Sequence, residues 1–246
     1  MINLLMETST ERALVSVAEG QHVLAQKSLP TGYDHSKQLL PAIQSLLGDL
    51  GIGLSQLSVV TTGVGPGSYT GIRVAVIVAK SLSLALSIPL IGVPSLSCFI
   101  PGEWLPTGDG RFAALIDAKI GGIYALFGEN HDGQVIYQTP PALLSISEVD
   151  QALQEISIIV TPNAIPLHRR LGQGAVDRWV WQERGPDAHQ MAKLADQSYR
   201  DGRYSKDHQV EILYLRPTQA EIEIKTGRNR TASPGNGEEG AFIYYL

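Results

Sequence analysis

Residues 59–74 read Val-Val-Thr-Thr-Gly-Val-Gly-Pro-Gly-Ser-Tyr-Thr-Gly-Ile-Arg-Val. An apolar run at 57–60 leads into the glycines, and a long apolar segment at 72–86 follows them, which predicts a strand, a glycine-rich loop and a helix. Such an arrangement directs backbone N–H groups and the positive end of a helix at one point. The loop is therefore either an anion-binding site or a tight turn that lets strand and helix pack closely.

The residues of this loop exclude three common enzyme motifs. A Walker A loop requires a lysine directly after a glycine, and the loop has none. Thr70 stands where a dinucleotide-binding fingerprint has its third glycine. Ser68 lacks the flanking glycines of a hydrolase elbow, because Pro66 and Thr70 occupy those places.

The two halves of the chain have a similar expected order of elements. The first half predicts three strands at 2–6, 13–18 and 22–29, followed by a helix at 34–47. A strand at 57–61, a helix at 71–87 and a strand at 89–93 complete it. The second half predicts three strands at 112–116, 123–127 and 135–138. A helix that starts at 147, a strand at 156–161 and a final helix at 187–202 follow them. A glycine- and proline-rich stretch at 101–110 suits a linker. We therefore expect an α/β fold with two lobes, 1–100 and 101–225, and a flexible tail at 226–246.

Composition narrows the class of protein. The 246 residues carry a formal net charge of −5, which argues against a protein that binds nucleic acid on its own. A single cysteine, Cys98, excludes an intrachain disulfide and a cysteine-based zinc site, and it fits a reducing cytosol. The start of the chain reads as a strand and lacks the basic region of a signal peptide. Lys80 and several serines interrupt the longest apolar segment, so we expect no membrane span.

The two helices expected in the first half carry apolar residues on more than one side. Apolar residues cover nearly the whole circumference of the helix at 71–87, where a surface helix has one apolar side. The helix is therefore either fully internal or part of a helical dimerisation surface.

Two turns after expected first strands carry polar groups. The turn at 7–10 offers a carboxylate and three hydroxyls, and Asp117 occupies the corresponding turn of the second half. Facing each other across a cleft, these turns could hold a metal-bound phosphate, with ordinary turn chemistry as the alternative. The histidines form no metal-binding pair, since His35 is followed four places on by Leu39.

The motif at 62–73 resembles that of the TsaB (YeaZ) family, which takes part in making N6-threonylcarbamoyladenosine in tRNA. Further matches lie along residues 1 to about 217, at 7–10, 35–41, 117–124 and 214–216. The resemblance implies two actin-like lobes of the ASKHA (acetate and sugar kinase, Hsc70, actin) fold. It also implies a cytoplasmic, non-catalytic relative of the TsaD subunit, with no catalytic activity alone.

The resemblance implies particular partners. The chain would bind a TsaD-type catalytic subunit through its first lobe, with a TsaE-type ATPase joining, and would form a homodimer when alone. It would meet tRNA only through the complex, which modifies the adenosine next to the anticodon. No tightly bound cofactor or metal is implied, with ATP or ADP and Mg²⁺ at the partner interface as the alternative.

Site residues follow from the matched motifs. The expected partner interface consists of His35, Leu39, Ile43, Tyr69, Ile72, Arg73, Val76, Ala79 and Lys80. The expected nucleotide or phosphate contacts are Glu7, Thr8, Ser9, Thr10, Gly65, Gly67, Ser68 and Asp117. Two departures argue against nucleotide binding by this chain alone: Glu7 stands where the family has Asp, and the loop at 161–164 lacks glycine.

A second functional hypothesis remains open at this point. The chain could act alone, either as a nucleotide-binding hydrolase that uses Glu7 and Asp117 or as a glycoprotease-like peptidase. The sequence provides neither an activated nucleophile nor a paired metal site to support that hypothesis.

Overall fold

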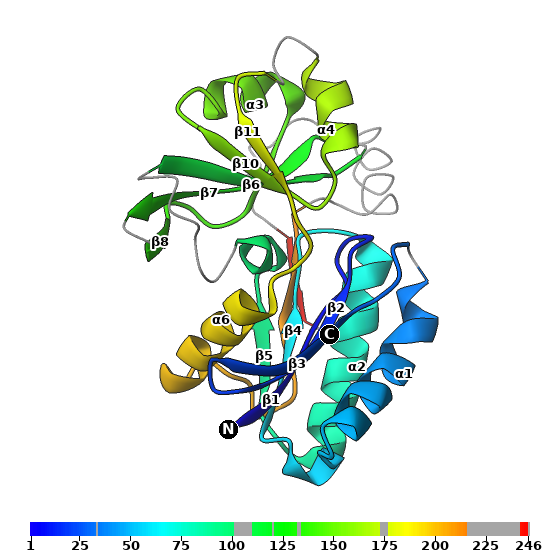
Figure 1. The fold of residues 1–246 in the computed structure, drawn as a ribbon. Coiled ribbons are helices and arrows are strands. Elements are labelled where there is room, and N and C mark those ends of the chain that lie inside the picture. The colour runs from blue at the N-terminus through cyan, green and yellow to red at the C-terminus, as the bar shows by residue number, and fades with distance from the viewer. Residues whose placement is uncertain are drawn as a thin grey trace, which may run out of the picture.

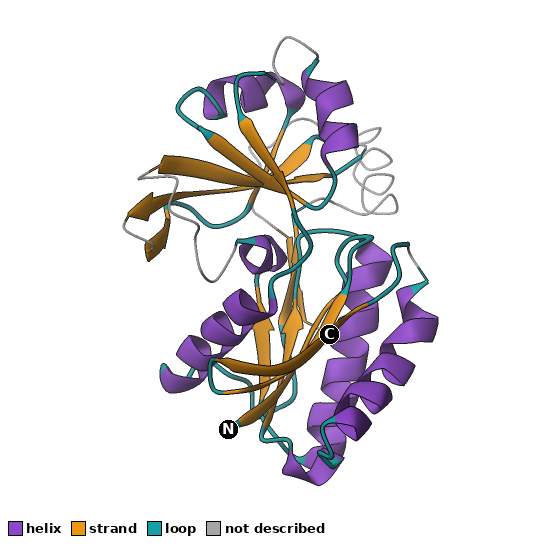
Figure 2. Cartoon of the chain, viewed as in Figure 1, coloured by secondary structure: helices purple, strands orange, loops and turns teal. Residues whose placement is uncertain are grey.

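The computed structural model describes residues 1–32, 34–100, 110–119, 121–131, 134–172, 177–215 and 242–245. Two mixed β-sheets, each with helices packed against it, form a lower and an upper lobe in Figures 1 and 2. Residues of the expected linker at 101–109 lie outside the described part of the chain.

The first sheet has the strand order β3-β2-β1-β4-β5. Its strands are β1 (Ile2–Glu7), β2 (Leu14–Glu19), β3 (His22–Ser28), β4 (Val59–Gly63) and β5 (Leu90–Val93). β1 pairs antiparallel with β2 and parallel with β4, and β4 pairs parallel with β5. β1 and β4 are buried along nearly their whole length, as expected for central strands with helices on both faces.

Helices cover both faces of this sheet. α1 (His35–Asp49) and α2 (Tyr69–Leu86) lie side by side on one face, and α6 (Ala188–Arg200) packs on the other (Figure 1). One core cluster joins α1 and α2 to the sheet, and a second joins α6 to it. The first core therefore fixes which sides of α1 and α2 face inward.

The second sheet repeats the arrangement of the first. Its order is β11-β10-β6-β7-β8, with parallel and antiparallel pairs in the same places, and β9 added beside β7. The strands are β6 (Gly110–Asp117), β7 (Ile123–His131), β8 (Gln134–Tyr137), β9 (Ala142–Leu144), β10 (Ile158–Thr161) and β11 (Val180–Glu183). Helices α3 (Ile146–Ala152) and α4 (Ala164–Leu171) pack on this lobe. This duplication confirms the expected α/β fold with two lobes of similar topology.

The chain returns to the first lobe after the second sheet, which differs from the expected boundaries. We expected 101–225 to form the second lobe, but α6 packs against strands of the first sheet and against the 3-10 helix Ser95–Phe99. β12 (Glu211–Tyr214) follows and is joined to the end of β4 by a hydrogen bond from the Leu213 N–H to the Val64 carbonyl.

The expected tail at 226–246 is described only in part. Within it, β13 (Phe242–Tyr245) pairs antiparallel with β12, so these last residues form a strand and not a free tail. Residues 226–241 and 246 lie outside the described part of the chain.

One described helix, α2, is long and apolar enough to cross a membrane by length and composition alone. Several of its side chains are buried in the first core, and the helix contacts α1 and β4. These contacts are those of a helix within a folded domain, which passes the same length test.

Candidate functional site

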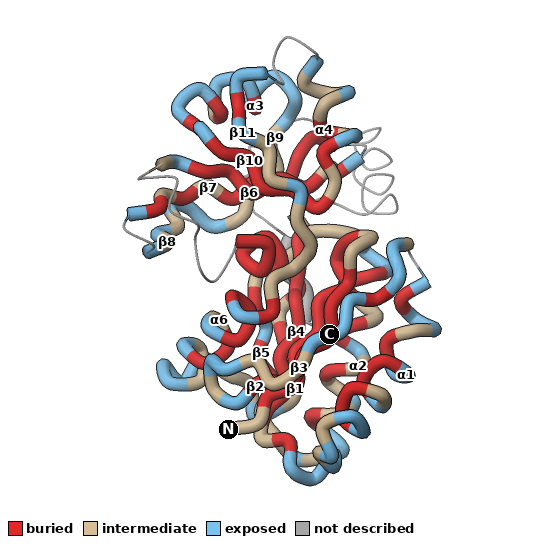
Figure 3. Tube along the Cα trace, viewed as in Figure 1, coloured by how far each residue is buried: buried red, intermediate tan, exposed pale blue. Residues whose placement is uncertain are grey.

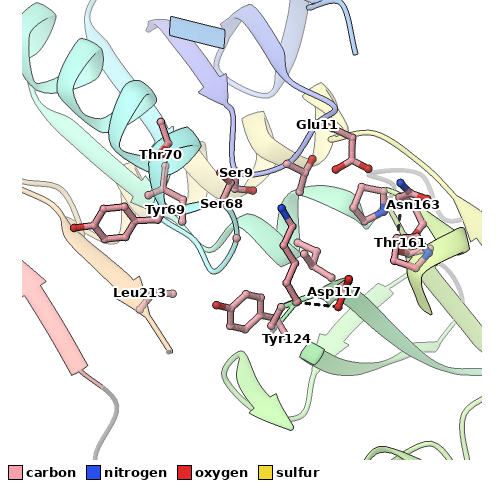
Figure 4. Close-up of a pocket in the computed structure, with 18 of the residues that line it drawn as sticks. Ser9, Glu11, Ser68, Tyr69, Thr70, Asp117, Tyr124, Thr161, Asn163 and Leu213 are labelled. Atoms are coloured by element: carbon pink, nitrogen blue, oxygen red, sulfur yellow. Dashed lines mark hydrogen bonds between the residues drawn. The ribbon is translucent and has the colours of Figure 1, made fainter. Parts of the chain in front are cut away.

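A cavity of about 630 Å³ lies between the two lobes. The turn after β1, the glycine loop and the start of α2 form one wall, and the turn after β6 and the loop after β10 form the other. Figure 4 shows Ser9 and Ser68 close together on the first wall, with Asp117 and Tyr124 across from them. The corresponding turns of the two lobes therefore line the same cavity.

Five of the eight expected nucleotide or phosphate contacts line this cavity: Ser9, Thr10, Gly67, Ser68 and Asp117. The other three, Glu7, Thr8 and Gly65, are not part of its wall. The cavity also has a side of apolar and aromatic residues, which includes Ile116, Tyr124 and Tyr214.

The glycines of the loop allow α2 to begin against the turn after β1. A Cβ atom at Gly71 would lie 2.0 Å from the Thr8 carbonyl oxygen, and one at Gly67 would lie 2.5 Å from that of Ser9. The Thr8 hydroxyl donates to the Gly71 carbonyl at 2.6 Å. Close packing thus requires glycine at both positions, in agreement with the tight-turn interpretation of the motif.

The Ser68 hydroxyl caps the helix that follows it. Its Oγ accepts a hydrogen bond from the Gly71 N–H at 3.3 Å, and Ser68 has the extended backbone of an N-cap residue. The described residues that line the cavity include no histidine or cysteine that could activate this hydroxyl as a nucleophile.

Glu7 is buried beneath the glycine loop, and its side chain does not line the cavity. The residue is fully buried, and its Oε1 accepts a hydrogen bond from the Ser9 N–H at 2.5 Å. A Cβ atom at Gly63 would lie 1.7 Å from Glu7 Oε2, so the strand passes directly over the carboxyl group. Burial raises the pKa of Glu7. The expectation that Glu7 contacts a nucleotide is thus not met.

Asp117 lines the cavity but already has two partners. Its Oδ1 forms an ion pair with Arg170 Nε at 2.7 Å and accepts a hydrogen bond from the Lys119 N–H at 2.9 Å. Among the described residues no group of three or more histidine, cysteine, aspartate or glutamate side chains could hold a metal ion. With Glu7 buried, Glu11 and Asp117 are the carboxylates that line the cavity, and two carboxylates hold Mg²⁺ only together with the phosphates of a nucleotide.

His35 ties the start of α1 to the turn after β1. The residue is buried, and its Nε2 lies 2.8 Å from the Thr10 carbonyl oxygen, to which it must donate. His35 therefore has a structural contact inside the chain and no surface for a partner.

Most of the expected interface residues are in the core of this chain. His35, Leu39, Ile43, Ile72, Val76 and Ala79 are each at most 3% exposed. The sheet covers these side chains, so they cannot contact a second protein in the folded state. Tyr69, Arg73 and Lys80 keep exposed surface, as expected.

The outward sides of the same two helices carry other large apolar residues. Leu40 on α1 and Tyr69, Ile77 and Leu84 on α2 are 41–61% exposed. Figure 3 shows buried segments of α1 and α2 alternating with exposed ones. We call this surface the docking face and define it by those four residues with the basic Lys37, Arg73 and Lys80, which are exposed or half-buried.

Sequence reasoning missed Leu40, Ile77 and Leu84, although a signal for them was present. Ala75 and Ala79 are the small residues that let α2 approach the sheet, and Ile77 and Leu84 lie away from them on the helix. In the cavity, Lys119, Tyr124 and Asn163 were not named as contacts either, although the sequence had singled out the segments 117–124 and 161–164 that contain them.

Comparison with protein-family models matches residues 30–155 to TsaD, described as tRNA N6-adenosine threonylcarbamoyltransferase. Among curated proteins, the chain is 32% identical over 236 residues to the tRNA threonylcarbamoyladenosine biosynthesis protein TsaB of Haemophilus influenzae, covering 87% of this chain and 92% of that one. It is 29% identical over 220 residues to TsaB of Escherichia coli K12, covering 87% and 94%.

Two solved structures from Pseudomonas aeruginosa are similar over most of the chain. One, described as an uncharacterized protein with similarity to peptidase YEAZ, has a TM-score of 0.71 at 26% identity and covers 87% of this chain and 99% of that one. The other, YeaZ, has a TM-score of 0.66 at 23% identity, covers 83% and 96%, and shares the fold.

Proposed function

The chain belongs to the TsaB family of tRNA threonylcarbamoyladenosine biosynthesis proteins, and we propose that it is the non-catalytic subunit that binds a TsaD-type catalytic subunit through the docking face. The observation that carries the proposal is the row of exposed apolar side chains on α1 and α2. A large apolar patch on the surface of a folded chain is typical of a protein-binding site.

The occupant follows from the family match. The matched residues 30–155 include all of α1 and α2, so a TsaD-type protein has a segment related to the docking face. Two related helical faces can bury each other around an approximate two-fold axis, as in a symmetric dimer. A TsaD-type subunit is therefore a suitable partner, and a second copy of this chain would be the alternative when that subunit is absent.

The site residues support a binding role over chemistry by this chain alone. The hydrolase hypothesis depended on Glu7 and Asp117, but Glu7 is sealed and Asp117 is paired with Arg170. The peptidase hypothesis required an activated nucleophile, and the Ser68 hydroxyl is used as a helix cap. In the proposed complex, a TsaE-type ATPase joins in the cytoplasm, and tRNA is contacted through the assembly.

The test is co-purification with a TsaD-type subunit from the same organism. Ile77→Asp places a charge on the docking face and should weaken binding at least about tenfold, because it must be desolvated on association. Ile165→Asp on α4 is a matched control, since Ile165 is 59% exposed and Ile77 is 56% exposed. Wild-type binding by a folded Ile77→Asp variant would rule out this face.

A second candidate function is the binding of a small ligand in the cavity between the lobes. The cavity volume of about 630 Å³ is typical of ligand pockets, and the start of α2, the positive end of that helix, forms part of one wall. Because Glu11 and Asp117 are the lining carboxylates, Mg²⁺ should bind only together with nucleotide phosphates and not alone. Calorimetry with ADP, with and without Mg²⁺, tests the proposal, and the absence of heat in both titrations would contradict it.

A further inference from the structure

The basic residues of the docking face have no carboxylate partner within the described part of the chain. α2 contains Arg73 and Lys80 and no acidic residue, although the whole chain has 24 acidic residues. α1 contains Lys37, and its only acidic residue is the last one, Asp49. None of these three basic side chains forms an ion pair with another described residue, whereas Arg12 and several other arginines do.

The charges lie within the apolar stripe. Arg73, Ile77, Lys80 and Leu84 are spaced by four, three and four residues, so they lie within about 60° of one another on a helix with about 100° per residue. A partner that covers Ile77 and Leu84 must therefore also cover Lys80 and Arg73. Burying an unpaired charge is costly, so the partner has to supply opposite charges there.

Arg73 is already held in place for such a contact. Its guanidinium lies 3.9 Å from the centre of the Tyr69 ring, and its Nε donates to the Tyr214 hydroxyl at 2.9 Å. The terminal nitrogens form no hydrogen bond to the described residues, so both can donate to a carboxylate. An arginine fixed in this way loses little side-chain freedom when it binds a carboxylate.

We propose that the docking face selects a partner whose helical surface carries carboxylates opposite Arg73 and Lys80, and that it disfavours a second copy of this chain. Two copies related by a two-fold axis would bring the same basic stripe against itself. Like charges across an interface suppress pairing, whereas opposite charges favour it. This inference rests on the proposed docking function and specifies the chemistry of its partner.

Added salt should change the affinity for the TsaD-type subunit and the affinity of this chain for itself in opposite directions. Added salt screens attraction and repulsion alike, so it weakens a complex held by opposite charges and relieves the repulsion between like ones. Binding to the TsaD-type subunit should therefore weaken several-fold between about 50 mM and about 500 mM NaCl, while self-association of this chain should strengthen.

The test measures affinity for the TsaD-type subunit with Lys80→Gln and Lys80→Glu. Loss of one charge should weaken binding about two- to fivefold and reversal about tenfold or more, with a smaller salt effect in both variants. Lys193→Glu on α6 is the control for net charge, because Lys193 is exposed on the other side of the first sheet. This variant should bind the TsaD-type subunit within about twofold of wild type.

The outcomes separate this inference from the docking function. If Ile77→Asp abolishes binding but Lys80→Glu binds as wild type and salt has no effect, the docking function stands and the charge inference is wrong. The charge inference is also overturned if salt weakens self-association. If Ile77→Asp binds as wild type, the docking function itself is wrong.

Discussion

Glu7 is the residue at which burial most changes the expected chemistry. Its carboxyl group lies beneath Gly63, its Oε1 accepts a hydrogen bond from the Ser9 N–H, and the Ser95 hydroxyl lies on the same side of Gly63. Burial penalises the charged form and raises the pKa of the group. A carboxyl group in this setting stabilises the core when protonated and is unsuited to binding a metal ion.

Replacement of Glu7 by Gln should therefore stabilise the chain at high pH. The pKa of Glu7 is raised in the folded state above its ordinary value of 4.5, so the stability that protonated Glu7 contributes is fully present below that pH and is lost as the pH rises through the folded-state pKa. Gln does not titrate, so the Tm of Glu7→Gln minus that of wild type should grow from pH 5 to pH 8. About 1 kcal/mol corresponds to about 2–4 °C for a chain of this size. A difference that shrinks over this range would contradict the assignment.

At the scale of elements, α2 shows what a sequence can and cannot predict. The glycine motif and the apolar run predicted this helix, and the strands and helix before it were also identified close to their observed bounds. The all-apolar pattern of α2 did not show which side faces the sheet, so the core residues Ile72, Val76 and Ala79 were expected at an interface. Short elements with weak periodicity, such as α4, β11 and β12, were missed.

The start of α2 should tolerate no side chain at Gly71. A Cβ atom there would collide with the Thr8 carbonyl, so Gly71→Ala must displace the helix from the turn after β1 and should cost about 2–3 kcal/mol or more. Gly48→Ala in α1 is the matched control, because its Cβ would meet nothing within 4 Å and alanine favours a helix by about 0.5–1 kcal/mol. Urea unfolding measures both, and equal stability of the two variants would refute the packing role of Gly71.

At the scale of the whole molecule, contacts across the lobes fix the cavity walls. Arg12 in the first lobe pairs with Glu183 on β11, and the Gln190 side chain of α6 donates to the Tyr137 hydroxyl at 2.9 Å. Burial raises the pKa of Tyr137 to about 12. These long-range contacts, like the return of α6 to the first sheet, depend on topology and leave no local pattern in the sequence.

The central claim is that this chain enables the reaction of another subunit by binding it through the docking face. The most direct measurement is threonylcarbamoyl transfer to tRNA in a mixture of a TsaD-type subunit, a TsaE-type ATPase and this chain. We expect modification to require the chain, to fall at least about tenfold with Ile77→Asp and to remain near wild type with Ile165→Asp. Full modification without the chain, or with a folded Ile77→Asp variant, would contradict the claim.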